Sequence, residues 1–191
     1  MARVLAISAH YDDVEIACGG SLLKHRDAGD EVFIAVIKSG DDLCGDPIIR
    51  QDEQIKSRNI LNGHLFCFGK RTNKEIVAEL DNINPDVIYI PYCKDTHQDH
   101  IEAFEIGKAV ARKVGIKRVL QYISPTSFEC YPSYFKAIDF YEKEKLIQVF
   151  QSQISRRPDY IEIAKAQNKL FGLLSGFNFA EGFNIIKWIE E

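Results

Sequence analysis

The chain has few cysteines among its 191 residues and no strongly basic segment. Its five cysteines are widely spaced and form no C-x-x-C pair, which argues against both a disulfide framework and a structural zinc knuckle. Reduced thiols of this kind are typical of a cytoplasmic protein. The formal net charge is −4 and no run of lysine or arginine occurs, so we do not expect nucleic acid as a partner.

A long apolar stretch is also lacking. No segment approaches the about 20 apolar residues that a membrane helix needs, and the N-terminal MARVLAISAH is too short for a signal peptide. We therefore expect no membrane insertion and a cytoplasmic location. The length of 191 residues predicts a single domain over residues 1–191. A chain this long buries roughly 70% of its unfolded surface, so it needs no disulfide or metal to stabilise its core.

Strand patterns alternate with helix patterns through the first two thirds of the chain. The expected strands cover residues 3–9, 31–41, 64–68, 86–91 and 118–123. The expected helices between them cover residues 12–29, 48–61, 73–83 and 99–114. Such alternation predicts right-handed βαβ units, and hence a Rossmann-like, doubly wound α/β fold with a mostly parallel sheet and helices on both faces.

The last third of the chain has a different pattern. It predicts an irregular aromatic segment over residues 124–140, helices over 142–154 and 158–174, and a strand over 183–190. No linker separates this part from the rest. We therefore expect a helical and β extension that packs on the same sheet.

Ionisable residues gather in two short stretches, AHYDDVE (residues 9–15) and DTHQDH (residues 95–100). The first stretch follows the expected strand 3–9, and the second follows the expected strand 86–91. If the strands adopt the common order 3-2-1-4-5, which we assume, these two strands are neighbours. Both stretches then reach the crevice beyond the carboxyl ends of the strands, where open α/β sheets bind ligands.

A cation would offset the negative charge in that crevice. Five carboxylates would meet there, those of Asp12, Asp13, Glu15, Asp95 and Asp99. One helix N-terminus offsets only part of their repulsion. Histidine nitrogens with one carboxylate suit zinc, and three protein ligands with an open fourth position mark a catalytic site. We therefore expect His10, Asp13 and His100 to hold one Zn²⁺ per chain, with another divalent metal as the alternative.

Other common sites are not indicated. The turn HYDDVEIACGG lacks G-x-G-x-x-G, and its acids occupy the helix N-terminus that a pyrophosphate would need. The sequence contains no G-x-S-x-G nucleophile elbow and no P-loop. Gly19 and Gly20 fall inside the expected helix, where we expect them to allow close packing of helix against strand.

The chain resembles the LmbE-like / PIG-L family of metal-dependent N-deacetylases over nearly its whole length. The motifs A-H-P-D-D-x-E and G-G-[ST]-L are similar to residues 9–15 and 19–22, and H-x-D-H is similar to residues 97–100. Further elements of the family, R-x-x-E, S-Q and A-E-x-F, are similar to Arg50 with Glu53, Ser152-Gln153 and Ala180 to Phe183. Tyr11 and Gln98 stand where the family has prolines.

The resemblance implies roles for these residues. His10, Asp13 and His100 would be the metal ligands, and Asp12 the general base. His97 would polarise the amide carbonyl and stabilise the oxyanion, with Asp99 orienting the ring of His97. Arg50 would reach the substrate, and Tyr11 and Asp95 are further candidate substrate contacts.

The implied activity is hydrolysis of an N-acyl group, such as the N-acetyl group of N-acetylglucosamine, from a small amino sugar or sugar conjugate. Two alternatives stay open. The same chemistry would serve a non-sugar acylated amine, such as an intermediate of a thiol or antibiotic pathway. A non-catalytic paralogue would hold the metal or a ligand only, although a binder needs no base beside its ligands. A homo-oligomer is also left open by the resemblance.

Overall fold

The computed structural model describes residues 1–39, 45–113, 115–127 and 129–190. Within them a seven-stranded sheet has the order β3-β2-β1-β4-β5-β7-β6. The strands are β1 (Arg3–Ser8), β2 (Glu31–Val36), β3 (His64–Cys67), β4 (Val87–Pro91), β5 (Arg118–Tyr122), β6 (Tyr134–Ala137) and β7 (Ala180–Trp188). The first five are parallel, whereas β7 pairs antiparallel with both β5 and β6. The assumed order 3-2-1-4-5 is thus confirmed, together with the Rossmann-like fold class.

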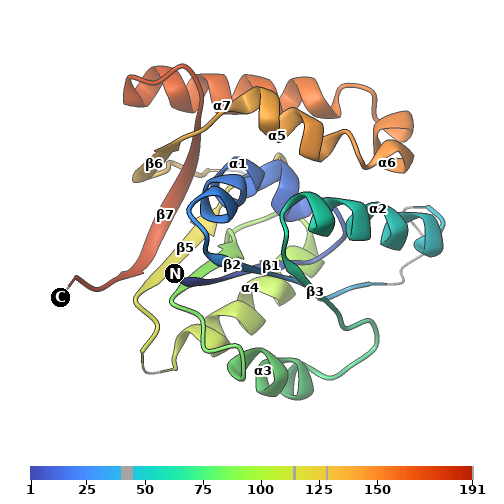
Figure 1. The fold of residues 1–191 in the computed structure, drawn as a ribbon, viewed down its shortest axis with the longest axis vertical. Helices are drawn as coiled ribbons and strands as arrows, with labels where there is room; N and C mark the ends of the chain where they lie inside the picture. The colour runs from blue at the N-terminus through green and yellow to red at the C-terminus, as the bar shows by residue number, and fades with distance from the viewer. Residues whose placement is uncertain (40–44, 114, 128, 191) are drawn as a thin grey trace.

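Helices cover both faces of this sheet (Figure 1). They are α1 (Asp13–Asp27), α2 (Pro47–Ile60), α3 (Asn73–Asp81), α4 (Gln98–Ala111), α5 (Phe140–Ile147), α6 (Gln151–Arg156) and α7 (Tyr160–Ser175). Helices α3 and α4 lie on one face, and α1, α2 and the helices of the C-terminal third lie on the other. No helix among the described residues is both long enough and apolar enough to cross a bilayer.

Strand β1 shows why the sheet is buried on both sides. Val4 and Ala6 belong to the apolar core beneath α1 and α5, and Leu5 and Ile7 belong to the core beneath α3 and α4. Successive side chains of a strand point to opposite faces, so an uninterrupted apolar run fits only a strand covered by helices on both sides. The run RVLAIS is therefore central, and its carboxyl end opens into the turn that begins with Ala9.

Several sequence predictions need correction. The segment 124–140 is not irregular throughout, because β6 forms the edge of the sheet within it. The helix expected over 142–154 is two helices, α5 and α6, which separate at Phe150 (φ −87°, ψ 57°) because this ring is fully buried in the core beneath α1. The predicted strand 31–41 ends at Val36 and the predicted helix 99–114 ends at Ala111; residues 40, 41 and 114 lie outside the described residues.

The two glycines of α1, which we expected to allow close packing of the helix against a strand, contact the C-terminal third: α5, Ile138 just after β6 and, through Glu181, strand β7. A Cβ on Gly20 would lie 2.8 Å from atoms of Ile138, and one on Gly19 would lie 3.0 Å from Leu146 of α5. Helix α1 is also kinked at Cys18 (φ −139°, ψ 16°). The kink and the missing side chains let α5 approach α1 closely.

A buried ion pair stabilises the contact of α1 with α5 and β7. Glu181 of β7 accepts hydrogen bonds from the backbone N–H groups of Gly20 and Ser21, both at 2.8 Å, and lies 2.7 Å from Nζ of Lys143. Lys143 also donates to Asn168 Oδ1 at 2.8 Å, and the Lys143 and Glu181 side chains are both 0% exposed. The G-G-S-L and A-E-x-F elements therefore meet in space and hold β7, α5 and α1 together.

Gly107 fixes the position of α4, whose N-terminus carries the second ionisable stretch. A Cβ on Gly107 would clash with Ile90 Cγ2 and would lie 3.3 Å from Ile7 Cδ1. We expect Gly107→Ala to lower the free energy of unfolding by about 1–3 kcal/mol, because the buried, β-branched Ile90 cannot turn away. Urea unfolding measures this, with the exposed Lys108→Ala as the control expected to stay within about 0.5 kcal/mol. An unchanged Gly107→Ala variant would mean that α4 is free to shift outward.

Candidate active site

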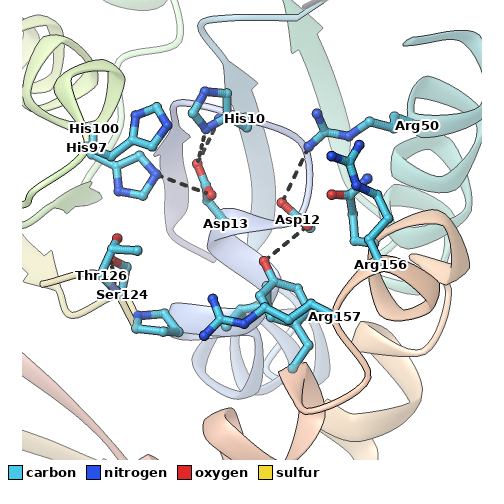
Figure 2. A pocket seen from close by; sticks show the side chains of 14 residues that line it. His10, Asp12, Asp13, Arg50, His97, His100, Ser124, Thr126, Arg156 and Arg157 are labelled. Carbon is cyan, nitrogen blue, oxygen red and sulfur yellow. Dashed lines mark hydrogen bonds and ion pairs between the residues drawn. The ribbon is translucent and has the colours of Figure 1, made fainter. Parts of the chain in front are cut away.

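The turn from β1 into α1 is strained and places adjacent carboxylates on different sides. Asp12 has φ 89° and ψ −23°, in the left-handed region that costs a non-glycine residue of order 1–3 kcal/mol. Two contacts hold the turn: the Asp12 N–H donates to Gln54 Oε1 at 3.2 Å, and the His10 N–H donates to Asp13 Oδ2 at 2.7 Å. As a result Asp13 points toward the histidines and Asp12 toward Arg50 (Figure 2).

The first turn of α4 brings two more histidines to the same place. His97 caps the helix, with its Nδ1 accepting from the Asp99 N–H at 3.3 Å, and His100 follows in the first turn. Ring nitrogens of His10, His97 and His100 lie within 4.8 Å of one another. The predicted juxtaposition of the two ionisable stretches is thereby observed.

The donor atoms fit a divalent metal ion. The Asp13 carboxylate lies 3.5 Å from His100 Nε2 and 3.7 Å from His10 Nδ1, so it stands between two imidazoles. His97 adds a third imidazole, but its side chain is 46% exposed, whereas that of His100 is 7% exposed. Nitrogen donors with a carboxylate are the set that zinc prefers. The ligand set His10, Asp13 and His100 stays a prediction, with His97 as the neighbouring donor.

Negative charge dominates around His100. Burial disfavours the imidazolium form, but the carboxylates of Asp13 and Asp95 outweigh that effect and raise the pKa of His100 to about 10. Burial would also raise the pKa of Asp13, yet His100 and His10 together lower it to about 2. A metal ion would take the place of this proton, because only a neutral imidazole coordinates a metal.

Asp95 is not among the residues that line the cavity, and its role as a substrate contact stays a prediction. Its side chain is 0% exposed and lies 3.0 Å from His100 Nδ1. It also accepts hydrogen bonds from the Ser124, Thr126 and Ser127 hydroxyls at 2.7–2.9 Å. These partners hold the pKa of Asp95 well below its ordinary value against the effect of burial. Asp95 therefore orients His100 and ties the chain after β5 to the site.

Asp99 contacts a different histidine from the one expected. Its Oδ2 lies 2.9 Å from His10 Nε2 but 3.8 Å from His97 Nδ1, which exceeds hydrogen-bond distance. The ring that the Asp99 carboxylate orients in this structure is that of His10. Asp99 contacts His97 through its backbone N–H, which donates to His97 Nδ1.

Asp12 occupies the opposite side of the turn and is almost fully buried. Tyr160 donates its hydroxyl to Asp12 Oδ2 at 3.2 Å, and Arg50 Nη2 lies 3.8 Å from Asp12 Oδ1. Burial, and then repulsion from Asp13, raise the pKa of Asp12 well above its ordinary value. A carboxyl group with a raised pKa is a better proton acceptor, which suits a general base.

Tyr11 lies in the core and does not line the cavity, and its role as a substrate contact also stays a prediction. The ring belongs to the core beneath α1, and its hydroxyl donates to Cys67 Sγ at 3.8 Å. Burial and the neighbouring Cys67 raise the pKa of Tyr11 to about 12. Arg50 does line the cavity and rests on this residue, donating to its carbonyl oxygen at 3.1 Å with the guanidinium 5.7 Å from the ring centre.

One cavity contains these groups and several that the sequence reasoning missed. The predicted residues lining it are His10, Asp12, Asp13, Arg50, His97 and His100. The missed ones are Ile16, Ser124, Pro125, Thr126, Arg156, Arg157 and Tyr160. Gln153, also in the lining, belonged to the S-Q element, which was the only sequence signal for the wall formed by α6 and the start of α7.

Helix α6 is attached to α2 by a single carboxylate. Glu53 of α2 accepts hydrogen bonds from the Ser152 backbone N–H at 2.8 Å and from the Ser152 hydroxyl at 2.6 Å. The R-x-x-E and S-Q elements therefore meet here, one turn away from the Arg50 side chain. This contact sets the position of α6 over the cavity.

Residues 5–111 match the family described as PIG-L, the GlcNAc-PI de-N-acetylases. The chain is 26% identical to the uncharacterized deacetylase YaiS of Escherichia coli over 152 residues, which cover 71% of this chain and 81% of that protein. It is 24% identical to the diacetylchitobiose deacetylase of Thermococcus kodakarensis, over 98% of this chain and 84% of that protein.

Among solved structures, the conserved protein TT1542 from Thermus thermophilus superimposes with a TM-score of 0.86 at 21% identity. The superposition covers 100% of this chain and 97% of that chain. This likeness concerns the fold, including the antiparallel extension of the sheet.

Proposed function

Because the chain belongs to the PIG-L family of de-N-acetylases, and is therefore an amide-bond hydrolase, we propose that it removes the N-acetyl or another N-acyl group from an amino sugar or sugar conjugate. The relative that acts on diacetylchitobiose supports a sugar substrate. The observation that carries the proposal is the cavity itself, where three imidazoles and Asp13 face the buried Asp12 across one turn.

We propose Zn²⁺ as the metal, held by His10, Asp13 and His100. When bound, such an ion lowers the pKa of water to about 7 and polarises a carbonyl group. The chain supports this binding through carboxylates behind the rings, Asp99 on His10 and Asp95 on His100. Partners of this kind fix the ring orientation of a ligand and raise its basicity.

Asp12 acts as the general base in this proposal. Its carboxyl group accepts the proton of the attacking water, and the raised pKa matches it to that task. The hydrogen bond from Tyr160 holds the carboxyl orientation while the proton is transferred. Glu15 is too deep to share this role, because it is fully buried and its Oε1 accepts from Gln54 and Ser57.

His97 stabilises the oxyanion that develops on the amide carbonyl. Its Nδ1 accepts the Asp99 N–H, so in the neutral ring the hydrogen resides on Nε2, which is then a donor. Its exposed side chain lines the cavity and is accessible to substrate. Losing one oxyanion donor typically costs on the order of 10²–10³ in rate.

Release of acetate from a panel of N-acetylated amino sugars tests the proposal. The purified chain, loaded with zinc, is expected to hydrolyse at least one of them, and to lose the activity on treatment with a chelator. If the chain hydrolyses only non-sugar acylated amines, the proposed amide hydrolysis stands but the proposal of a sugar substrate is wrong. Zinc binding without any hydrolysis would favour a binding protein instead.

His10→Ala is expected to reduce bound zinc to well under half a mole per mole of chain, because it removes one of three ligands. Mass spectrometry of the metal content after gel filtration measures this. His64→Ala is the matched control, since His64 lies on β3 and stacks on Phe33 with ring centres 4.7 Å apart. Full zinc content in His10→Ala would remove His10 from the ligand set.

A further inference from the structure

The wall of the cavity opposite the histidines carries three arginines (Figure 2). Arg50 comes from α2, Arg156 is the last residue of α6, and Arg157 follows it. A Cβ on Gly45 would lie 3.4 Å from Arg156 Nη1 and 3.9 Å from Arg50 Cδ, so these two side chains adjoin each other. The cavity therefore has a histidine and carboxylate side and an arginine side, with Asp12 between them.

The charges of these arginines are poorly neutralised within the described part of the chain. The Arg156 side chain has no hydrogen bond or ion pair there. Arg157 pairs with Asp159 at 3.4 Å, but both side chains are more than half exposed, and such a pair holds an arginine weakly. Arg50 is buried, its Nε has no hydrogen-bond partner among the described residues, and its Nη2 stays 3.8 Å from Asp12.

Three guanidinium groups on one wall of a cavity repel one another in a protein of net charge −4. Guanidinium groups are weakly hydrated and present planar pairs of donors that match phosphate and carboxylate oxygens. An anion at this wall would accept hydrogen bonds from the unpaired N–H groups of Arg50 and Arg156. Its negative charge would also offset the repulsion among the three guanidinium groups.

We propose that the substrate carries an anionic group, a phosphate or a carboxylate, and that Arg156, Arg157 and Arg50 bind it while the acyl group lies at the histidines. This inference rests on the proposed function and narrows its substrate class to anionic N-acyl amino sugars. Arg156 and Arg157 bind the group directly, and Arg50 lies between this group and Asp12.

Three substrates test the need for a negative charge and distinguish a phosphate from a carboxylate. They are the neutral methyl N-acetylglucosaminide, N-acetylglucosamine 1-phosphate and N-acetylmuramic acid. The zinc-loaded protein is expected to show a kcat/KM at least tenfold higher for one anionic compound than for the neutral one. Arg156→Ala and Arg157→Ala are each expected to lower that ratio by about 10- to 100-fold, the loss typical of one charged hydrogen bond. Arg156→Lys should lose less, because it keeps the charge but not the paired donors.

Arg112→Ala is the matched control. It is an exposed arginine just beyond the C-terminus of α4, about 20 Å along that helix from His97, and it should leave the ratio unchanged. Arg156 and Arg157 are both exposed, so their variants should fold, which a thermal melt verifies.

Equal kcat/KM for neutral and anionic sugars, with no change in the arginine variants, would overturn the anion site and leave the deacetylase proposal intact. If no compound is hydrolysed, the deacetylase proposal fails, and calorimetry with N-acetylglucosamine 1-phosphate and N-acetylmuramic acid still decides the anion site. The anion site is supported if the protein binds either anionic sugar and the Arg156→Ala variant binds it at least tenfold more weakly. Absence of such binding, or binding indifferent to Arg156 and Arg157, refutes it.

Discussion

Replacing Asp12 by asparagine is expected to lower kcat by about 10²–10⁴-fold while leaving the zinc content unchanged. Asparagine keeps the size of the side chain and tolerates the left-handed backbone at this position, so the turn survives. It can also accept the hydrogen bond from Tyr160. Only the capacity to take a proton is lost, which isolates that function from the structure of the site.

Single-turnover acetate release and metal analysis of the same sample check this result. The control is Asp52→Asn, an exposed carboxylate on α2 that pairs with Lys56 at 2.6 Å. Near-native turnover in Asp12→Asn would exclude Asp12 as the base. Loss of zinc together with turnover would instead assign Asp12 a part in holding the metal.

Glu181→Ala is expected to lower the free energy of unfolding by about 3–5 kcal/mol. The change leaves the Lys143 ammonium group buried without its counter-charge and two N–H groups of the α1 kink without acceptors. Removing one member of a buried ion pair is costly because the other charge remains away from water. The site itself is untouched, so activity per folded molecule should change little at low temperature.

Chemical denaturation followed by circular dichroism measures this loss. Lys56→Met is the comparison, since the Lys56 and Asp52 side chains are 59% and 60% exposed and an ion pair in solvent contributes little to stability. A Glu181→Ala variant as stable as Lys56→Met would mean that Lys143 finds water or another acceptor after the change.

Much of the fold was predictable because the strands are short, apolar and separated by amphipathic helices. That pattern identifies a parallel sheet, and the parallel sheet brings the ends of β1 and β4 together. The convergence of His10, Asp13 and His100 followed from this local information. His10 and Asp13 lie in the turn and helix start after β1, and His100 lies in the first turn of the helix after β4, so their positions follow from local structure.

The side-chain directions of Tyr11 and Asp95 could not be predicted in the same way. Both were candidate substrate contacts in the sequence, but the direction of a side chain in a turn depends on backbone angles. The positive φ of Asp12 sends adjacent residues to different sides, and three hydroxyls beyond β5 draw Asp95 inward. Neither feature has a signature in the sequence.

Of the three arginines only Arg50 was predicted; Arg156 and Arg157 were missed because they come from the C-terminal third, where the S-Q element was the only signal for this wall of the cavity. The location of α6 depends on the buried Phe150, its N-cap residue, and on the contact of Ser152 with Glu53, which directs α6 over the cavity. Contacts between segments about 100 residues apart are decided by packing of the whole chain.

The connection from α6 to α7 carries Arg157 and, three residues later, the Tyr160 that hydrogen-bonds Asp12. If Arg157 binds the anionic group and Asp12 is the base, as proposed, one short connection positions residues for both roles. Substrate selectivity and the basicity of Asp12 would then not vary independently. Grafting the loop of a relative to change the accepted sugar would retune the acid–base chemistry as well, and a useful exchange has to preserve the tyrosine while altering the two arginines.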